Sequence, residues 1–259
     1  MHFTVSKTNF SKGLSAVLQV VPAKSTLPIL TNVLVKADGA KIYISGTDLT
    51  MGIRTAVEAE IHTPGAITMP AKRLSEIVQA MPDYPISVSL NNHKVTIECG
   101  RSVFCITGID ADEYPNFPVI KDQQQIEIDS ESFFNQFNKT IYAVSSDEMR
   151  PIFNGVYWKL TQNEMAMVAT DGHRLSKVVR KLSPDEVTMS AETSIGVIIP
   201  PKALTNSKRL LSSYDKIAII FDANFIIFNV ENHFIYTRLI DGKYINYEQV
   251  IPVSNNKTL

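Results

Sequence analysis

Apolar side chains recur at helical spacing near the beginning of the chain. They follow the i, i+4, i+7, i+8, i+11 spacing of an amphipathic helix at Phe10, Leu14, Val17, Leu18 and Val21. Ser6 precedes this stripe as a candidate helix cap, and the pattern predicts a helix over residues 7–20. A second helix is predicted over residues 71–81, where Pro70 marks the start.

Short apolar runs around these helices predict strands, at residues 3–5, 30–36, 41–45, 65–69, 86–90, 94–99 and 102–107. Apolar and polar residues alternate in 94–99, which is typical of an antiparallel sheet with one face in water. Dipeptides that favour hairpin turns separate several of the runs, at Asp38-Gly39, Asn91-Asn92 and Gly100-Arg101. The order of elements indicates an α+β domain in which two helices pack on one face of a mainly antiparallel sheet.

The second half of the chain repeats the first. At an offset of 123 residues a second helix stripe appears with Asp129 as its candidate cap, and Thr47-Asp48 aligns with Thr170-Asp171. At an offset of 130 residues, segment 69–75 aligns with 199–205 and segment 114–117 with 244–247. We interpret the chain as a tandem duplication with one domain over residues 1–120 and a second over 121–252.

The composition is that of a folded protein. Of 259 residues, 44% are apolar and 20% charged, which excludes a disordered chain, and the net charge of -1 excludes a polybasic one. No segment approaches the roughly 18 apolar residues of a membrane span and no secretory leader is recognisable, so a cytoplasmic location without membrane contact is expected. Cys99 and Cys105 are expected to fill core space, and His93 and His233 to be exposed turn residues.

Basic residues concentrate in the expected helices and in the loop after the first helix. These stretches, 7–24, 71–81, 129–142 and 202–214, carry nine basic and three acidic residues, a net charge of +6 that leaves about -7 for the remainder. The basic residues are Lys7, Lys12, Lys24, Lys72, Arg73, Lys139, Lys202, Lys208 and Arg209. Such a layer suits sequence-independent contact with nucleic-acid phosphates. Helices that merely carry lysine on their wet faces would show the same pattern, and charge counts alone leave both interpretations open.

Seven motifs, in order along the whole chain, carry a resemblance to a known family. They lie at residues 1–5, 26–32, 46–49, 70–72, 150–156, 169–175 and 239–244. In these segments the chain resembles the bacterial sliding clamps, the beta subunits of DNA polymerase III. The resemblance implies tandem clamp domains of the DNA clamp fold, whose helices line a central hole and whose sheets form the outer wall. It implies a processivity factor of DNA replication that encircles double-stranded DNA, with no catalytic activity and no cofactor or metal.

The resemblance also implies two sets of site residues. The implied DNA-binding residues are Lys24, Lys72, Arg73, Arg150, Lys202 and Arg209, although Arg150 also suits a turn-stabilising role. The implied peptide pocket comprises Phe153, Thr170, Gly172, His173, Arg174, Leu175, Ile245 and Val250. This pocket would take short peptides of the DNA polymerase III catalytic subunit and of the clamp loader. Ile245 stands where the family frequently has proline, and from the residues alone a turn over a core is an alternative interpretation of this segment.

The chain is shorter than the members of the family it resembles. Those proteins have three such domains and close the ring as head-to-tail homodimers. Residues 253–259 are expected to begin a linker to an absent third domain, so that this truncated chain would not close the usual ring and would have a weakened pocket. A six-domain ring of three chains is an alternative. Two other classes of protein are alternatives: a small-molecule binder with a cleft between the copies, and a hydrolase that uses Asp171 and His173 with Ser145, Ser146 or Asp147.

Overall fold

The computed structural model describes residues 1–118, 124–182 and 194–252. It divides into two compact units. Unit 1 comprises Met1–Phe134 and Lys202–Arg238, and unit 2 comprises Asn135–Pro201 and Leu239–Leu259. Within the described residues, no helix is long and apolar enough to span a bilayer.

Two antiparallel sheets form unit 1. The five-stranded sheet has the order β5-β1-β7-β8-β9, with bounds β1 (His2–Val5), β5 (Glu60–Thr63), β7 (Ile86–Asn91), β8 (Lys94–Cys99) and β9 (Ser102–Thr107). The eight-stranded sheet has the order β10-β15-β16-β17-β4-β3-β2-β6. Its strands are β2 (Asn32–Asp38), β3 (Lys41–Thr47), β4 (Met51–Glu58), β6 (Gly65–Pro70), β10 (Gln124–Asp129), β15 (Lys216–Phe221), β16 (Phe225–Val230) and β17 (His233–Arg238).

The eight-stranded sheet joins the two halves of the sequence. Strand β17, from the second half, pairs antiparallel with β4, from the first, and places Ile235 opposite Ile53. Both side chains are fully buried. The sequence analysis predicted strands for each copy separately, so it did not predict that one sheet would contain strands of both copies.

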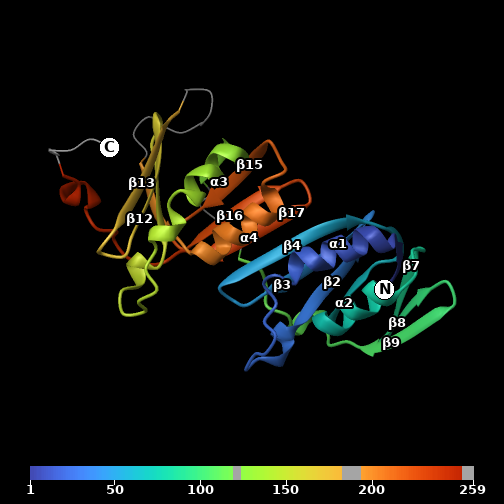
Figure 1. Ribbon diagram of the computed structural model, residues 1–259. Helices are drawn as coiled ribbons and strands as arrows, with labels where there is room; N and C mark the ends of the chain where they lie inside the picture. The colour runs from blue at the N-terminus through green and yellow to red at the C-terminus, as the bar shows by residue number, and fades with distance from the viewer. Residues whose placement is uncertain (119–123, 183–193, 253–259) are drawn as a thin grey trace. The chain divides into compact units, whose positions relative to one another are not determined.

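Helices cover one face of these strands. Helix α1 (Lys7–Val17) packs on β3 and β4 and lies beside α2 (Ala71–Ala80) (Figure 1). The predicted cap is confirmed, because the Ser6 hydroxyl oxygen accepts a hydrogen bond from the Asn9 amide at 3.2 Å. The predicted end at residue 20 is wrong: beyond Val17 the chain continues only as a tight turn, in which the Val20 amide bonds the Val17 carbonyl.

The helices of the second half follow the same plan. Asp129 caps α3 (Ser130–Asn138) by accepting a hydrogen bond from the Ser132 amide at 2.8 Å, as predicted. This helix ends four residues before the predicted end at 142, since the chain then enters a short 3-10 segment, Ile141–Ala143. Helix α4 (Pro201–Leu211) begins at a proline, one residue before the expected start at 202.

Strands β4 and β5 were not predicted from the sequence. The segment of β4 contains Gly52, Arg54 and Ala56, which are poor strand formers or charged, so the local signal is weak. Pairing with β3 on one side and β17 on the other stabilises this strand. Long-range hydrogen bonding therefore overrides the local preference.

Unit 2 contains one antiparallel sheet of order β13-β12-β11-β14. Its strands are β11 (Val156–Leu160), β12 (Glu164–Thr170), β13 (Leu175–Lys181) and β14 (Ile195–Ile199). Trp158, at the centre of β11, is fully buried and is the largest side chain of the core. Strand β12 is buried continuously from Met165 to Thr170, as expected for one of the two inner strands of this sheet.

The two cysteines are free thiols. Cys99 is buried as expected, but the prediction is wrong for Cys105, which is exposed on β9. Strand β9 is the last strand of its sheet, so within the described residues no strand pairs with its outer edge.

Candidate nucleic-acid and peptide sites

Helix α2 separates apolar and basic side chains onto different faces. Leu74 and Val78 are fully buried, whereas Lys72 and Arg73 at the helix start are exposed. The ammonium of Lys72 is 4.0 Å from the Glu76 carboxylate, and exposed pairs of this kind hold their partners weakly. Both cations are therefore accessible to an anion in solution.

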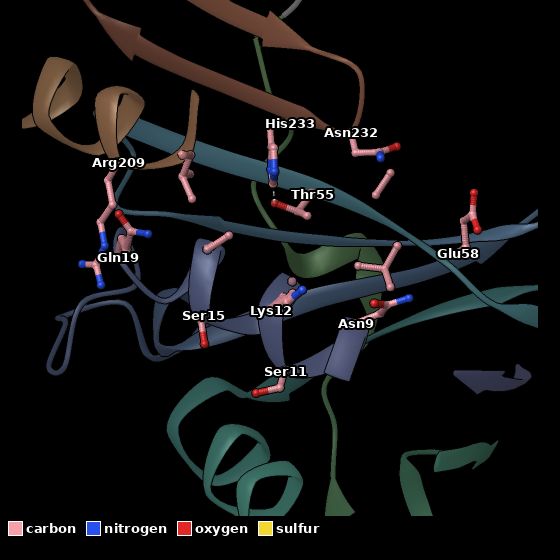
Figure 2. Close-up of a pocket in the computed structure, with 15 residues that line it drawn as sticks. Asn9, Ser11, Lys12, Ser15, Gln19, Thr55, Glu58, Arg209, Asn232 and His233 are labelled. Atoms are coloured by element: carbon pink, nitrogen blue, oxygen red, sulfur yellow. Dashed lines mark hydrogen bonds between the residues drawn. The ribbon is translucent and has the colours of Figure 1, made fainter. Parts of the chain in front are cut away.

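Residues of α1 and α4 line a common groove of about 550 Å³ within unit 1 (Figure 2). Lys12 and Ser15 reach it from α1, and Arg209 reaches it from α4. The two helices belong to different halves of the duplication, so cations from both copies meet here. Hydroxyl, amide and cationic groups together can bind phosphate oxygens without reading a base. We refer to this site as the α1–α4 groove.

A half-buried histidine lies in the α1–α4 groove. His233 Nδ1 is 3.1 Å from the Thr55 hydroxyl (Figure 2). Burial lowers the pKa of His233 from its ordinary value, and the Glu231 carboxylate opposes that shift only in part. The expectation of an exposed turn residue is wrong for His233, which begins strand β17, whereas His93 does lie in an exposed turn.

Lys202 is already engaged within unit 1. Its ammonium donates to Asp48 Oδ2 at 2.6 Å. Burial pushes the pKa of Asp48 upward, but hydrogen bonds from Lys202, Thr50 and the Met51 amide outweigh it and hold the pKa below its ordinary value. A phosphate would have to compete with this carboxylate for Lys202.

The remaining predicted DNA-binding residues are divided between the two units. Lys24 is exposed in the loop after α1, in unit 1 with Lys72, Arg73 and Arg209. Arg150 is in unit 2, where its Nε donates to Asp147 Oδ2 at 3.0 Å and its guanidinium is 5.5 Å from the centre of the Phe153 ring. Arg150 therefore lies beside Phe153, which is a predicted residue of the peptide pocket, and not with the predicted DNA-binding residues of unit 1.

A hydrogen-bonded turn follows β12 and carries four of the predicted pocket residues. The Thr170 hydroxyl donates to the Arg174 carbonyl and accepts from the Gly172 amide. Asp171 Oδ1 accepts from the amides of His173 and Arg174 at 2.9 and 3.0 Å. These amide bonds, with Arg174, lower the pKa of Asp171 to about 2.

Backbone geometry explains the glycine in this turn. Gly172 has φ of +92°, in the region that side chains disfavour, and an added Cβ would approach Arg150 Nη1 at 3.2 Å. The Asp171 carboxylate is directed to backbone amides and to Arg174, and not arranged to orient the His173 ring as a hydrolytic triad requires.

Three of the four apolar members of the predicted pocket belong to one cluster in unit 2. Phe153, Leu175 and Ile245 pack, partly buried, against buried residues that include Tyr244 and Tyr247. Tyr244 stacks on the Tyr157 ring with centroids 4.8 Å apart, and burial raises the pKa of Tyr244 to about 12. Val250, His173 and Arg174 are exposed residues of the same unit. The arrangement offers an apolar surface bordered by hydrogen-bonding groups.

The sequence analysis did not predict two features of these sites. Lys12 was counted among the helical cations but not assigned to a site, although its spacing from the buried Phe10 and Leu14 places it off the apolar stripe. The stacked tyrosines of unit 2 gave no local signal, because Tyr157 and Tyr244 are far apart in the chain.

The folded molecule belongs to the class of DNA clamps: repeated α+β halves share a sheet, and cationic helices of the two halves line one groove. The chain belongs to the family of DNA polymerase III beta subunits, the bacterial beta sliding clamps of DNA replication. The model of the beta subunit N-terminal domain matches residues 1–118, and that of the central domain matches residues 127–246.

Similar proteins agree with this assignment. The beta sliding clamp of Bacillus subtilis is 32% identical over 262 residues, covering 97% of this chain and 68% of that protein. The crystal structure of the B. subtilis clamp superimposes with a TM-score of 0.91 at 31% identity, covering 98% of this chain and 68% of its own. The Pseudomonas aeruginosa sliding clamp bound to griselimycin gives 0.91 at 28% identity, with coverages of 99% and 69%. The Helicobacter pylori beta clamp bound to a DNA ligase peptide, 23% identical, shares the fold with a TM-score of 0.89 and coverages of 98% and 70%.

Proposed function

We propose that this chain is part of a ring-shaped clamp that encircles duplex DNA, and that it tethers the DNA polymerase III catalytic subunit and the clamp loader to the DNA through short peptides. The observation that carries the proposal is the α1–α4 groove, where Lys12 and Arg209 come from different copies of the repeat. In this role the chain makes and breaks no bond, and it acts in the cytoplasm. Weak phosphate contacts hold the duplex without fixing its register, so the clamp slides. Tethering then raises the effective concentration of the polymerase at the primer end.

The proposed DNA contacts are Lys24, Lys72, Arg73 and Arg209, together with Lys12 from the groove. All of them are exposed cations of unit 1. Lys202 is assigned instead to the ion pair with Asp48, from which a phosphate would have to displace it. Arg150 is assigned to the border of the peptide pocket, because it lies against Phe153.

Charge reversal tests the DNA contacts. Lys12→Glu with Arg209→Glu, and separately Lys24→Glu with Arg73→Glu, should weaken binding of a short fluorescent duplex and flatten its dependence on salt. Removal of one phosphate interaction should reduce the log–log salt slope by about 1. The melting temperature should change little, because these side chains are exposed.

A control variant reverses the same number of positive charges outside the helices. Lys94→Glu with Lys216→Glu alters exposed lysines on β8 and β15, outside the helices. This control should keep nearly the parental salt slope. Equal losses in control and test variants would show that net charge, and not the helical layer, governs binding.

The proposed peptide pocket is the cluster of Phe153, Leu175 and Ile245 bordered by the turn at Gly172, with Thr170, His173, Arg174 and Val250 around it. Its apolar wall suits the aromatic or aliphatic side chains of a peptide tail, and the glycine permits close approach to the backbone. The ligase peptide bound to the H. pylori clamp gives support from a protein of the same fold.

Leu175→Ala tests this pocket. Loss of an apolar wall should weaken binding of a fluorescent polymerase-tail peptide about tenfold, which corresponds to roughly 1.4 kcal/mol. Leu27→Ala makes the same chemical change at an exposed leucine of unit 1 and should leave peptide affinity unchanged. Parental affinity in Leu175→Ala would remove this cluster from the pocket.

The proposal extends to domains and assembly. Residues 1–120 and 121–252 are proposed as successive clamp domains, which the spans of the two family models support. With a third such domain, two chains would close a head-to-tail homodimeric ring. The chain spans 68% of the B. subtilis relative.

A further inference from the structure

The α1–α4 groove has the volume of a small-molecule site. Its volume of about 550 Å³ lies within the range of roughly 300–1,000 Å³ that is common for ligand pockets. Gly13 permits the close approach of α1 to β4, since an added Cβ would lie 2.6 Å from a side-chain carbon of Val57. Both residues line the groove, so its wall is formed where the helix meets the strand.

The groove follows the axis of α1. Asn9, Lys12, Ala16 and Gln19 are spaced by three or four residues, which places them on one side of the helix and of the turn after it, and all four line the groove. At the helical rise of 1.5 Å per residue, the part from Asn9 to Ala16 alone covers about 10 Å. The groove is therefore elongated, with one end near Asn9 and the other near Gln19.

Charged side chains of opposite sign lie at the two ends of the groove. Figure 2 shows Arg209 beside Gln19 at one end, Glu58 on the side of Asn9 at the other, and Lys12 between them. The three charged side chains are exposed, and within the described residues none of them forms an ion pair. Two cations and one carboxylate are therefore available to a ligand.

Hydrogen bonds hold other polar groups of the groove in place. Asn232 Oδ1 accepts a hydrogen bond from the Lys41 ammonium at 3.0 Å, which leaves the Asn232 NH2 group as a donor for a ligand. The Thr55 hydroxyl holds the His233 ring between the two ends (Figure 2).

The end of the groove near Arg209 also has an unused hydrogen-bonding atom. Gln19 Oε1 is buried and has no hydrogen-bond partner within the described residues. Buried polar atoms without a partner are uncommon in folded proteins, and an additional donor would satisfy this one. The cationic end is thus incompletely satisfied by the chain itself.

The carboxylate distinguishes this groove from a track for a DNA strand. A strand laid along it would bring a further phosphate toward Glu58, and the two negative charges would repel each other. Arg209 and Lys12 suit one terminal phosphate, whereas Glu58 suits an uncharged group that donates from N–H or O–H. A mononucleotide has this distribution, because it carries one phosphate at one end and hydroxyl and base N–H groups beyond it.

We propose that the α1–α4 groove binds a nucleoside monophosphate. The phosphate contacts Arg209 and Lys12, and donors of the sugar or base contact Glu58. The His233 ring between the two ends provides a flat surface on which a base can stack.

A bound mononucleotide would compete with duplex DNA for Lys12 and Arg209. This consequence rests on the proposed function, which assigns the same two cations to DNA. Binding of the mononucleotide itself does not require DNA, so the two proposals are measured separately.

Calorimetric titration of the whole chain tests whether the two ends act together. AMP, adenosine and inorganic phosphate serve as separate titrants in the absence of DNA. AMP should bind about tenfold more tightly than either fragment, because one ligand then engages both ends. An affinity for AMP no higher than that for inorganic phosphate would overturn the proposal, as would the absence of AMP binding at millimolar concentration.

Alanine variants at the two ends test the orientation. Arg209→Ala should weaken AMP about tenfold and leave adenosine unchanged, because only AMP carries the phosphate. Glu58→Ala should weaken both AMP and adenosine, because both carry the donor groups. Arg101→Ala and Glu98→Ala remove the same kinds of charge at exposed positions outside the groove and should leave all affinities unchanged. Parental AMP affinity in both groove variants would overturn the proposal.

A fluorescent duplex, titrated separately, distinguishes this site from the proposed function. AMP binding that follows the predicted variants while the duplex fails to bind would support the nucleotide site and overturn the proposed DNA contacts. Duplex binding without AMP binding would overturn the nucleotide site alone. When both bind, saturating AMP should weaken the duplex affinity of the parent, and an unchanged duplex affinity would overturn the competition.

Discussion

At the scale of single residues, the same side-chain type acts differently in the two halves because its partners differ. Asp48 and Asp171 both cap a turn through Oδ1, but Oδ2 binds Lys202 in the first case and Arg174 in the second. Asp48 therefore joins the two copies, while Asp171 only stabilises its own turn. The amide bonds that hold the pKa of Asp171 near 2 keep it charged at any physiological pH.

His233 should make stability depend on pH. Burial lowers its pKa in the folded state, so the unfolded chain takes up the proton first as the pH falls through about 6.5. The stability is therefore complete above that pH and declines below it. Urea unfolding at a series of pH values should show a smaller decline between pH 7 and pH 5 for His233→Gln than for the parent. His93→Gln, at an exposed turn, is the control, and an unchanged decline in His233→Gln would contradict the assignment.

At the scale of elements, side-chain caps define where the helices begin. Ser6 and Asp129 occupy matching positions of the repeat, and each accepts an amide hydrogen bond three residues on. The sequence defines the helix ends less well than the starts. The apolar stripe continues beyond Val17, but the residues that follow Val17 form a turn and not a further turn of helix.

Removal of the first cap should destabilise the protein measurably. Ser6→Ala leaves the Asn9 amide without its acceptor and should lower the free energy of unfolding by about 1 kcal/mol. Thr8→Ala, an exposed position inside the same helix, should have no such cost because alanine favours the helix. Urea titration measures both, and an equal stability of Ser6→Ala and parent would exclude a capping role.

At the scale of the whole molecule, the β17–β4 junction makes unit 1 extend across the duplication. Tyr236 fits over Gly52, and its hydroxyl is 2.7 Å from that of Thr47. A Cβ at Gly52 would overlap the tyrosine ring. The junction therefore requires a residue without a side chain at this point.

Gly52→Val should separate the two strands. Steric overlap and the missing hydrogen bond should together cost about 2 to 4 kcal/mol. Hydrogen exchange should then show β4 and β17 amides losing protection together. Tyr236→Phe removes only the bond to Thr47 and should cost about 1 kcal/mol. A Gly52→Val protein with parental exchange rates would show that the junction tolerates the side chain.

Local pattern was sufficient for much of the fold. The duplication, the starts of α1 to α4 and the strand over 94–99 follow from short-range spacing, capping residues and alternation. The turn at Gly172 and the apolar residue Leu175 were both predicted from the motif at residues 169–175, because the residues of a motif lie within a few positions of one another. Their assignment to a peptide site remains a prediction.

The sequence by itself determined the repeated elements and the positions of their cations, because helix periodicity and capping act over a few residues. Only tertiary structure decided which strands join the halves, that Lys202 pairs with Asp48 and that His233 is half-buried. Strand β4 depends on β17, and Lys202 on Asp48, across more than 150 residues of chain. Pairing over such separations depends on how the elements pack, and it leaves no local pattern in the sequence.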